Sequence, residues 1–373
     1  MKRKGILLLL CSLVLSAAPA QAQKMRIGTY TFKDGAIYTG EMMAGRPHGE
    51  GKTMFKSGDV YEGHYVKGKR QGKGTYTFTD GEKYEGEWLQ DQQHGRGVYY
   101  FMNNNRYDGL WYRDYQQGEG KMYYYNGDVY QGNWSQDKRQ GKGTYQYANG
   151  ASYSGEWKDD KKSGKGKFLW PDGSTYDGEW ANNLRNGRGT YHYADGDVYD
   201  GEWKDDNQHG KGIYRFKNGN VYEGQYAHGE RTGAGVFTFK NGDKYVGNFL
   251  NGEKSGEGTM IWKNGPQYQG QWKDDMRHGH GKYTWRNGDV YEGGWAKDKM
   301  DGEGILRMAD GTKFKGQFMG GVKHGKCIEE DKNGVRFEGT YMDGLREGPF
   351  VEKDRNGTVI RRGTYVKGVA QVE

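Results

Sequence analysis

The chain has 373 residues, a formal net charge of +7 and only 33% hydrophobic residues, which excludes a polytopic membrane protein and leaves little Leu, Ile or Val for globular cores. Aromatic residues nevertheless make up 15% of the chain, which argues against a disordered protein, and glycine accounts for 66 residues. The fold class therefore depends on how the aromatic residues and glycines are spaced.

Residues 1–22 are predicted to be a secretory signal peptide. Lys2, Arg3 and Lys4 form a basic start, and the apolar run Ile6–Leu15 is shorter than the roughly 20 residues that span a bilayer. Ala20-Gln21-Ala22 is a small-x-small cleavage signal. The sequence thus predicts export to a periplasmic, cell-surface or secreted location.

Removal of this segment changes two quantities. The net charge falls from +7 to +4, and Cys327 is left as the one cysteine of the mature chain. A single thiol forms neither an intrachain disulfide nor a four-ligand zinc site. A charge of +4 without a concentrated basic stripe also argues against nucleic-acid binding.

A period of 23 residues runs through nearly all of the remaining chain. From Tyr38 to Phe337 an aromatic residue recurs every 23 residues, always with glycine two residues later. When Gly74 is numbered position 1 of the unit and Tyr84 position 11, glycine dominates positions 1, 8, 13 and 22, and all 11 Trp lie at positions 5 and 15. The pattern predicts an array of about 14 units over residues 23–350 and a degenerate capping repeat over 351–373.

Each unit has the signature of a β-hairpin. Residues 74–88 alternate in polarity on both sides of Asp80-Gly81. A two-residue loop at positions 7–8 would divide the rings between both faces. A three-residue loop at positions 6–8 pairs position 5 with 9 and 3 with 11, and it gathers positions 3, 5, 11 and 15 on one face. We favour the second register because it gives one aromatic and one polar face, and we interpret the charged positions 16–21 as exposed loops between hairpins.

Position 8 of the repeat lies in the predicted turn and is glycine in every occurrence but one, where asparagine replaces it. Because asparagine tolerates positive φ well, this pattern indicates that the backbone needs a positive φ there. The predicted structural turn residues are Gly81, Asn104, Gly127 and Gly150.

The segment Tyr84-Glu85-Gly86-Glu87-Trp88, followed by Gly95 and Gly97, resembles the MORN (membrane occupation and recognition nexus) repeat. The resemblance covers residues 28 to about 368, and with the predicted signal peptide it points to a secreted or periplasmic bacterial type. It implies an all-β fold, an elongated single-layer antiparallel sheet of tandem 23-residue hairpins. It also implies roles as a scaffold, in protein contacts and in binding anionic phospholipid. No long stretch lies outside the repeats to hold a catalytic domain, so we expect no enzyme.

Two interpretations of the aromatic face remain open: the rings stack on neighbouring units, or they leave a groove for a partner, lipid or glycan. The candidate surface consists of Trp88, Trp111, Trp134, Trp157, Trp180, Trp203, Lys158, Lys161 and Arg185. Neither a catalytic group nor a cofactor or metal site is expected, because the histidines of position 21 lie in different units and paired carboxylates such as Glu85 and Glu87 recur on the polar face.

The leading functional hypothesis is a non-catalytic scaffold for protein–protein interaction at the cell envelope, whose partner is either an unknown protein or a second copy of the chain. The alternative is a binding module, either for anionic phospholipid through basic loops in a peripheral membrane contact, or for envelope glycan through the aromatic face.

Overall fold

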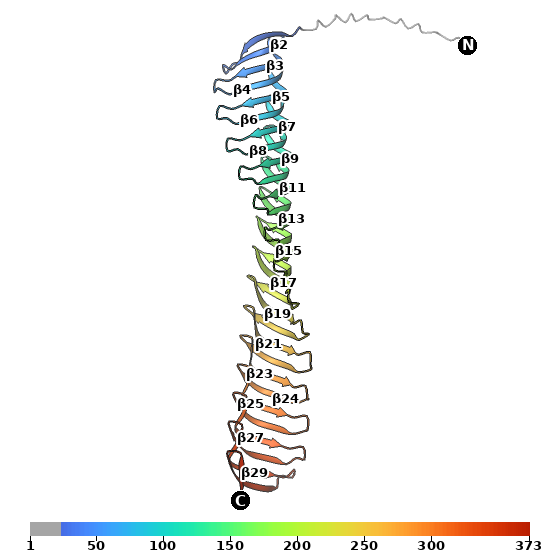
Figure 1. Ribbon diagram of the computed structural model, residues 1–373, viewed down its shortest axis with the longest axis vertical. Coiled ribbons are helices and arrows are strands. Elements are labelled where there is room, and N and C mark those ends of the chain that lie inside the picture. The colour runs from blue at the N-terminus through green and yellow to red at the C-terminus, as the bar shows by residue number, and fades with distance from the viewer. Residues whose placement is uncertain (1–23) are drawn as a thin grey trace, which may run out of the picture. The chain divides into compact units, whose positions relative to one another are not determined.

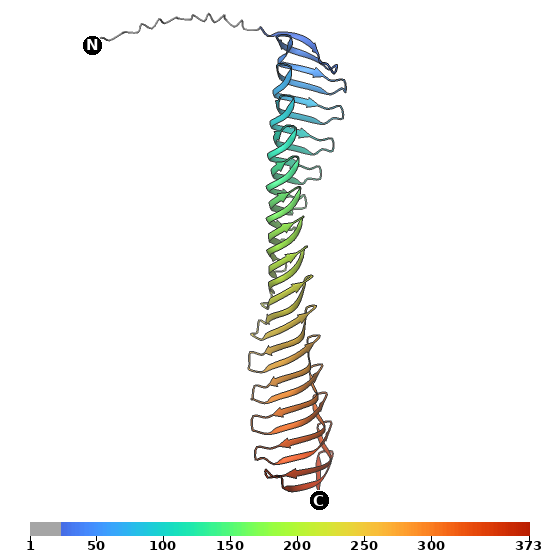
Figure 2. The same ribbon diagram turned by 180° about the vertical axis from the view of Figure 1, so that it is seen from behind.

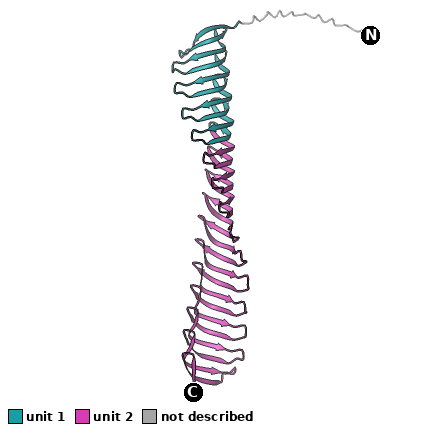
Figure 3. Ribbon diagram, in the orientation of Figure 1, with its two compact units in different colours: residues 1–137 teal, residues 138–373 magenta. Residues whose placement is uncertain are grey.

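The computed structural model describes residues 24–373, so the predicted signal peptide lies outside the described residues. The chain divides into two compact units, one ending at Asp137 and one beginning at Lys138 (Figure 3). Every regular element among residues 24–373 is a β-strand. In the same part of the chain, no helix has the length and apolar character needed to cross a membrane.

Unit 1 is an antiparallel sheet in which each strand pairs with the next one along the chain (Figure 1). Its strands are β1 (Arg26–Thr31), β2 (Ile37–Met43), β3 (Arg46–Met54), β4 (Val60–Val66), β5 (Lys69–Thr77), β6 (Lys83–Leu89), β7 (Gln92–Tyr100), β8 (Arg106–Tyr112), β9 (Tyr115–Tyr123) and β10 (Val129–Ser135).

Unit 2 follows the same rule (Figure 2). Its strands are β11 (Lys138–Gln146), β12 (Ser152–Lys158), β13 (Lys161–Leu169), β14 (Thr175–Ala181), β15 (Leu184–His192), β16 (Val198–Lys204), β17 (Asn207–Arg215), β18 (Val221–Ala227), β19 (Glu230–Thr238), β20 (Lys244–Leu250), β21 (Glu253–Ile261), β22 (Gln267–Lys273), β23 (Met276–Thr284), β24 (Val290–Ala296), β25 (Lys299–Arg307), β26 (Lys313–Met319), β27 (Val322–Glu330), β28 (Arg336–Met342), β29 (Leu345–Lys353), β30 (Val359–Val366) and β31 (Val369–Val372).

The hairpin register is the one that the three-residue loop predicts. Between β5 and β6, Tyr76 pairs with Tyr84 and Gly74 with Gly86. The Phe78 N–H donates to the Glu82 carbonyl at 2.9 Å, which closes the loop at positions 5 and 9. Positions 3, 5, 11 and 15 therefore share one face of the sheet.

The turn residues at position 8 have the positive φ that their residue types indicated. Gly81, Gly127 and Gly150 lie at +95°, +90° and +91°, and Asn104 lies at +64°. In the loop of Gly81, the Asp80 carboxylate accepts the Glu82 N–H at 3.0 Å, which explains Asp or Asn at position 7.

The expectation of exposed loops over positions 16–21 is wrong. Strand β6 continues to Leu89 and β7 begins at Gln92, so the connection is only Gln90-Asp91, with φ of +51° and +75°. Two successive positive φ values define a type I′ turn, whose twist matches that of the flanking strands. The sequence does carry this signal, because position 18 is Asp, Asn or Gly in every unit from Gly45 to Gly344.

In the C-terminal repeat the bulky residue of position 15 is Tyr365, one residue later than the 23-residue period places it, and a β-bulge accounts for the shift. Lys353 pairs with Val359, but Glu352 pairs with Arg361, so β30 carries one extra residue, Ile360. This bulge is why Tyr365 falls one residue late in the sequence pattern yet still lies buried.

Candidate interaction surfaces

A column of buried tyrosines at position 11 of the 23-residue repeats forms the core of both compact units. Tyr84 is 0% exposed, and a Cβ atom built on Gly86 or Gly97 would lie 2.4 Å from its hydroxyl oxygen. That hydroxyl donates to the Glu87 carbonyl at 2.9 Å. Glycine at positions 13 and 1 thus lets two neighbouring strands lie directly against the ring, an arrangement in which the ring covers the strand glycines.

The tryptophans of position 15 extend this core. The Trp88 ring stands perpendicular to Tyr84 at a centroid distance of 5.2 Å, and its Nε1–H donates to the Gly74 carbonyl at 3.2 Å. The six tryptophans of the predicted surface are only 4–6% exposed, so their ring faces are not available to a ligand. They are Trp88, Trp111, Trp134, Trp157, Trp180 and Trp203.

A basic residue at position 20 covers many of these indoles, a role that the sequence analysis missed. The Arg185 guanidinium carbon lies 4.3 Å from the Trp203 ring centre, and its Nε and Nη2 donate to the carboxylate and carbonyl of Asp206 at 3.0 and 2.8 Å. Arg185 therefore packs within unit 2. Lys158 and Lys161, from the same predicted surface, are exposed beside a type I′ turn.

Lys162, another member of this column, packs against two rings. Its Nζ lies 4.3 Å from the Trp180 ring centre and 4.7 Å from that of Phe168, and burial lowers the pKa of the amine to about 8. We expect an NMR titration of the ¹³C-dimethylated protein to place the Lys162 midpoint near pH 8. Because the unfolded chain keeps its proton to about pH 10.4, stability should rise with pH between these two values.

The control for this titration is Trp180→Leu, which should move the Lys162 midpoint toward the ordinary lysine value. A wild-type midpoint above pH 10 would contradict the burial of the amine.

A second, half-buried row of rings runs along positions 3 and 5 of unit 2. Successive ring centres lie 4.4–5.8 Å apart, with interplanar angles of 36–50°. The rings are Tyr145, Tyr147, Phe168, Trp170, Tyr191, Tyr193, Tyr214, Phe216, Phe237 and Phe239. Each ring is turned toward its neighbours, so the row resembles a packed core edge more than a platform on which sugars stack.

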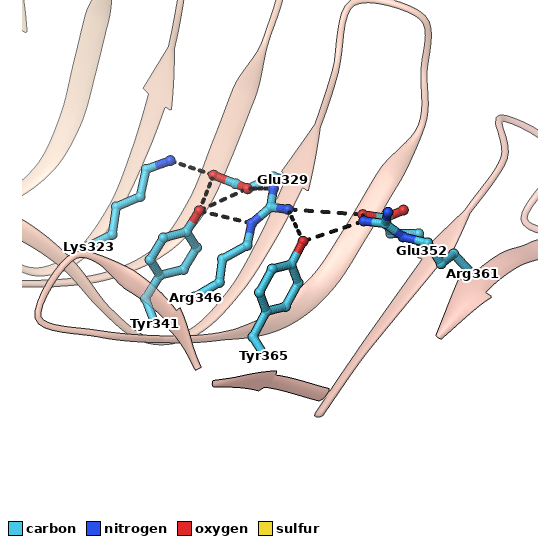
Figure 4. Close-up of polar contacts among 7 residues, drawn as sticks. All are labelled: Lys323, Glu329, Tyr341, Arg346, Glu352, Arg361 and Tyr365. Carbon is cyan, nitrogen blue, oxygen red and sulfur yellow. Dashed lines mark hydrogen bonds and ion pairs between the residues drawn. The ribbon is translucent and has the colours of Figure 1, made fainter. Parts of the chain in front are cut away.

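Near the C-terminus, glutamate takes the place of the position-3 ring. The Glu329 carboxylate, with a side chain only 12% exposed, pairs with Lys323, accepts from Arg346 Nη2 at 2.5 Å and from the Tyr341 hydroxyl at 3.1 Å (Figure 4). Burial alone would raise the pKa of Glu329, but the hydrogen bonds from Lys323 and Arg346 outweigh it and hold that pKa below its usual value.

The network continues into the next 23-residue repeat, where Glu352 also takes the place of the position-3 ring. Arg346 Nη1 lies 4.0 Å from the Glu352 carboxylate, which also accepts from Arg361 Nη2 at 2.9 Å, and Arg346 Nη1 donates to the Tyr365 hydroxyl at 3.1 Å (Figure 4). These contacts join β27 to β30 through side chains as well as through the strand ladder, which makes the network a structural one.

Three consecutive type I′ turns of unit 2 carry exposed apolar pairs across their strands. Val322 lies 3.7 Å from where a Cβ on Gly344 would be, and Leu345 lies 3.6 Å from the same point on Gly368, so neighbouring turns are in contact. The six side chains are 43–68% exposed. We call them the C-terminal turn ridge: Met319, Val322, Met342, Leu345, Val366 and Val369.

The face opposite the rings holds an open groove of about 640 Å³ between β15 and β20, lined by charged residues and also by the apolar Ile213, Val236 and Val246. Its walls alternate in charge through Arg188, Asp200, Lys211 and Glu223, and glycine backbone forms its floor. The pattern agrees with the solvated strand face that the sequence analysis assigned to these carboxylates.

Comparisons with known proteins agree with this geometry. The MORN repeat family model matches fourteen tandem segments without a gap, from residues 38–60 to residues 337–359. No match to a curated protein was found.

Among solved structures, the SAS-4 (dCPAP) TCP domain of Drosophila melanogaster, in complex with a proline-rich motif of Ana2, has 17% identity and a TM-score of 0.28, over 42% of this chain and 85% of that one. The G-box domain of the microcephaly protein CPAP has 14% identity and a TM-score of 0.28, over 54% and 99%. The TCP10 domain of Danio rerio CPAP, in complex with a STIL peptide, has 10% identity and a TM-score of 0.19, over 84% and 98%. Scores this far below 0.5 carry no inference about function. The register, the repeating tyrosine column and the fourteen matched segments together establish that the chain belongs to the MORN repeat family.

Proposed function

We propose that this MORN repeat protein is a non-catalytic scaffold that is exported and binds other proteins at the cell envelope. The observation that carries the proposal is the C-terminal turn ridge, because six adjacent apolar side chains with this exposure mark a surface that another molecule covers. The predicted signal peptide supports export. The rings and the basic residues of position 20 are used within the repeats, so binding falls to the margins of the sheet.

The size of the ridge suits an anchor within a larger contact. Fully burying a Val, Leu or Met side chain yields about 1.5–3 kcal/mol, so covering six half-exposed ones gains roughly 5–9 kcal/mol. Association itself costs about 4–15 kcal/mol. The ridge therefore needs further contacts, and a partner that also reaches other loops of unit 2 would supply them.

The test compares three forms of the mature protein recovered from the envelope fraction: wild type, the ridge variant Met342→Gln/Leu345→Thr, and the control Lys204→Gln/Asn207→Thr at the same positions of another turn. Chemical crosslinking with quantitative mass spectrometry, together with sedimentation velocity, should show partners or self-association in wild type and control that drop at least fivefold in the ridge variant. Identical profiles for all three forms, with no self-association, would contradict the proposal.

A further inference from the structure

Four successive loops of unit 2 present a basic residue at position 6. The residues are exposed and recur once per repeat in the loops that join β17 to β18, β19 to β20, β21 to β22 and β23 to β24, which Figures 1 and 2 show stacked along one margin of the sheet. We call them the basic loop row: Lys217, Lys240, Lys263 and Arg286. The sequence alone does not single them out, because each stands alone in its own repeat.

The loops hold these side chains in a regular array. The stem of Lys240 lies 3.2 Å from where a Cβ on Gly219 of the preceding loop would be, and that of Lys263 lies 3.1 Å from the same point on Gly242. The backbone is fixed as well, because the Lys263 N–H donates to the Asp243 carboxylate at 2.9 Å. Each stem thus rests on the preceding loop, and the charged end reaches solvent.

The four cations of the row outnumber the two carboxylates in the same loops, Asp243 and Asp289, each of which accepts a backbone N–H of the following loop. Among the residues that the structure describes, none of the four forms an ion pair. The neighbouring position 7 is the uncharged asparagine in all four loops: Asn218, Asn241, Asn264 and Asn287. The row ends at Ala194 on one side and Ala309 on the other, where position 7 returns to aspartate.

We propose that the basic loop row binds an extended acidic segment of a partner protein. Two strands per repeat place successive cations about 9.6 Å apart, and three residues of an extended chain span about 10 Å. A segment with a carboxylate at every third residue therefore meets one cation per repeat. The four tips consist of Lys or Arg, Asn and Gly, so they have no apolar side chain to insert into a membrane. The inference rests on the proposed scaffold function and specifies that the partner protein carries an extended acidic segment.

The probe is a fluorescent 18-residue peptide, (Glu-Ser-Gly)₆, with a comparison peptide of the same composition whose six glutamates are contiguous. Anisotropy titrations use the full mature chain at two salt concentrations. We expect the spaced peptide to bind at least fivefold tighter than the block peptide. The variant Lys217→Gln/Lys240→Gln/Lys263→Gln/Arg286→Gln should lose at least tenfold in affinity for it.

The matched control removes four other exposed charges of unit 2, as Lys158→Gln/Lys161→Gln/Lys204→Gln/Lys273→Gln, and should change the affinity less than twofold. Circular dichroism confirms that both variants fold. Equal losses in the two variants, or a preference for the block peptide, would overturn the inference, as would row-dependent binding of vesicles with phosphatidylserine but not of the peptide. A negative result here leaves the ridge experiment intact, so the two proposals can fail separately.

Discussion

Replacing Gly189 with alanine is expected to destabilise unit 2 by about 3 kcal/mol, the upper end of the usual cost of overpacking, because the new Cβ would lie 2.4 Å from the Tyr176 hydroxyl oxygen and 2.5 Å from two of its ring carbons. The ring has no room to retreat, since it is 0% exposed and its hydroxyl donates to the Glu179 carbonyl at 3.0 Å. Urea unfolding followed by tryptophan fluorescence, with hydrogen exchange of β14–β16 to localise the loss, measures the effect.

Two single variants separate the steric cost from the conformational one. Gly173→Ala adds a methyl group where nothing lies within 4 Å, but at a φ of +86°, and should cost only about 1–2 kcal/mol. Tyr176→Phe removes one hydrogen bond and should cost about 1 kcal/mol. A loss at Gly189 no larger than that at Gly173 would contradict a tightly confined ring.

The chain itself contains the corresponding double substitution. Each of the twelve tyrosines of position 11, from Tyr38 to Tyr291, is followed thirteen residues later by glycine. Where phenylalanine takes the position, the later residue is larger: Cys327 after Phe314, and Phe350 after Phe337. Phe337 and Phe350 stack at 5.8 Å and 27°. Without the hydroxyl that fixes the ring to a carbonyl, the ring can shift, so Tyr176→Phe should recover part of the loss in Gly189→Ala.

The hairpin could be predicted from the sequence because its determinants are local. The turn glycine, the alternation on either side of it and the facing of Gly74 and Gly86 all lie within fifteen residues. The type I′ turn was missed although its signal is equally local, because Asp at position 18 was interpreted as the charge of a loop rather than as a residue that tolerates positive φ.

The roles of Arg185 and of the basic loop row could not be predicted from the sequence for a different reason. Arg185 contacts Asp206, 21 residues away, and Lys240 lies over Gly219 of the preceding loop. Such contacts cross from one repeat to the next and appear only when the units are stacked in register. The exposed ridge likewise becomes a surface only when three turns lie side by side.

Replacing Glu329 with glutamine is expected to destabilise the C-terminal strands by about 3 kcal/mol, because the half-buried Lys323 would lose its carboxylate and the half-buried Arg346 would lose the closer of its two. Glu329→Tyr should cost much less. In other repeats an aromatic ring occupies position 3 and packs against the basic residue of position 20. Arg185, for example, lies 5.2 Å from the Tyr191 ring centre. Hydrogen exchange of β27–β31 measures the loss without requiring the whole array to unfold.

The stability that ionised Glu329 contributes should depend on pH in a definite direction. A carboxyl whose pKa is lower in the folded state gives stability that is complete above the unfolded value, about 4.3, and is lost as the pH falls through the folded pKa. Wild-type protection of β27–β31 should therefore drop below about pH 4, whereas the Glu329→Gln variant should lack that component of the drop. A tyrosine variant as damaged as the glutamine variant would mean that shape, rather than the buried cations, requires glutamate here.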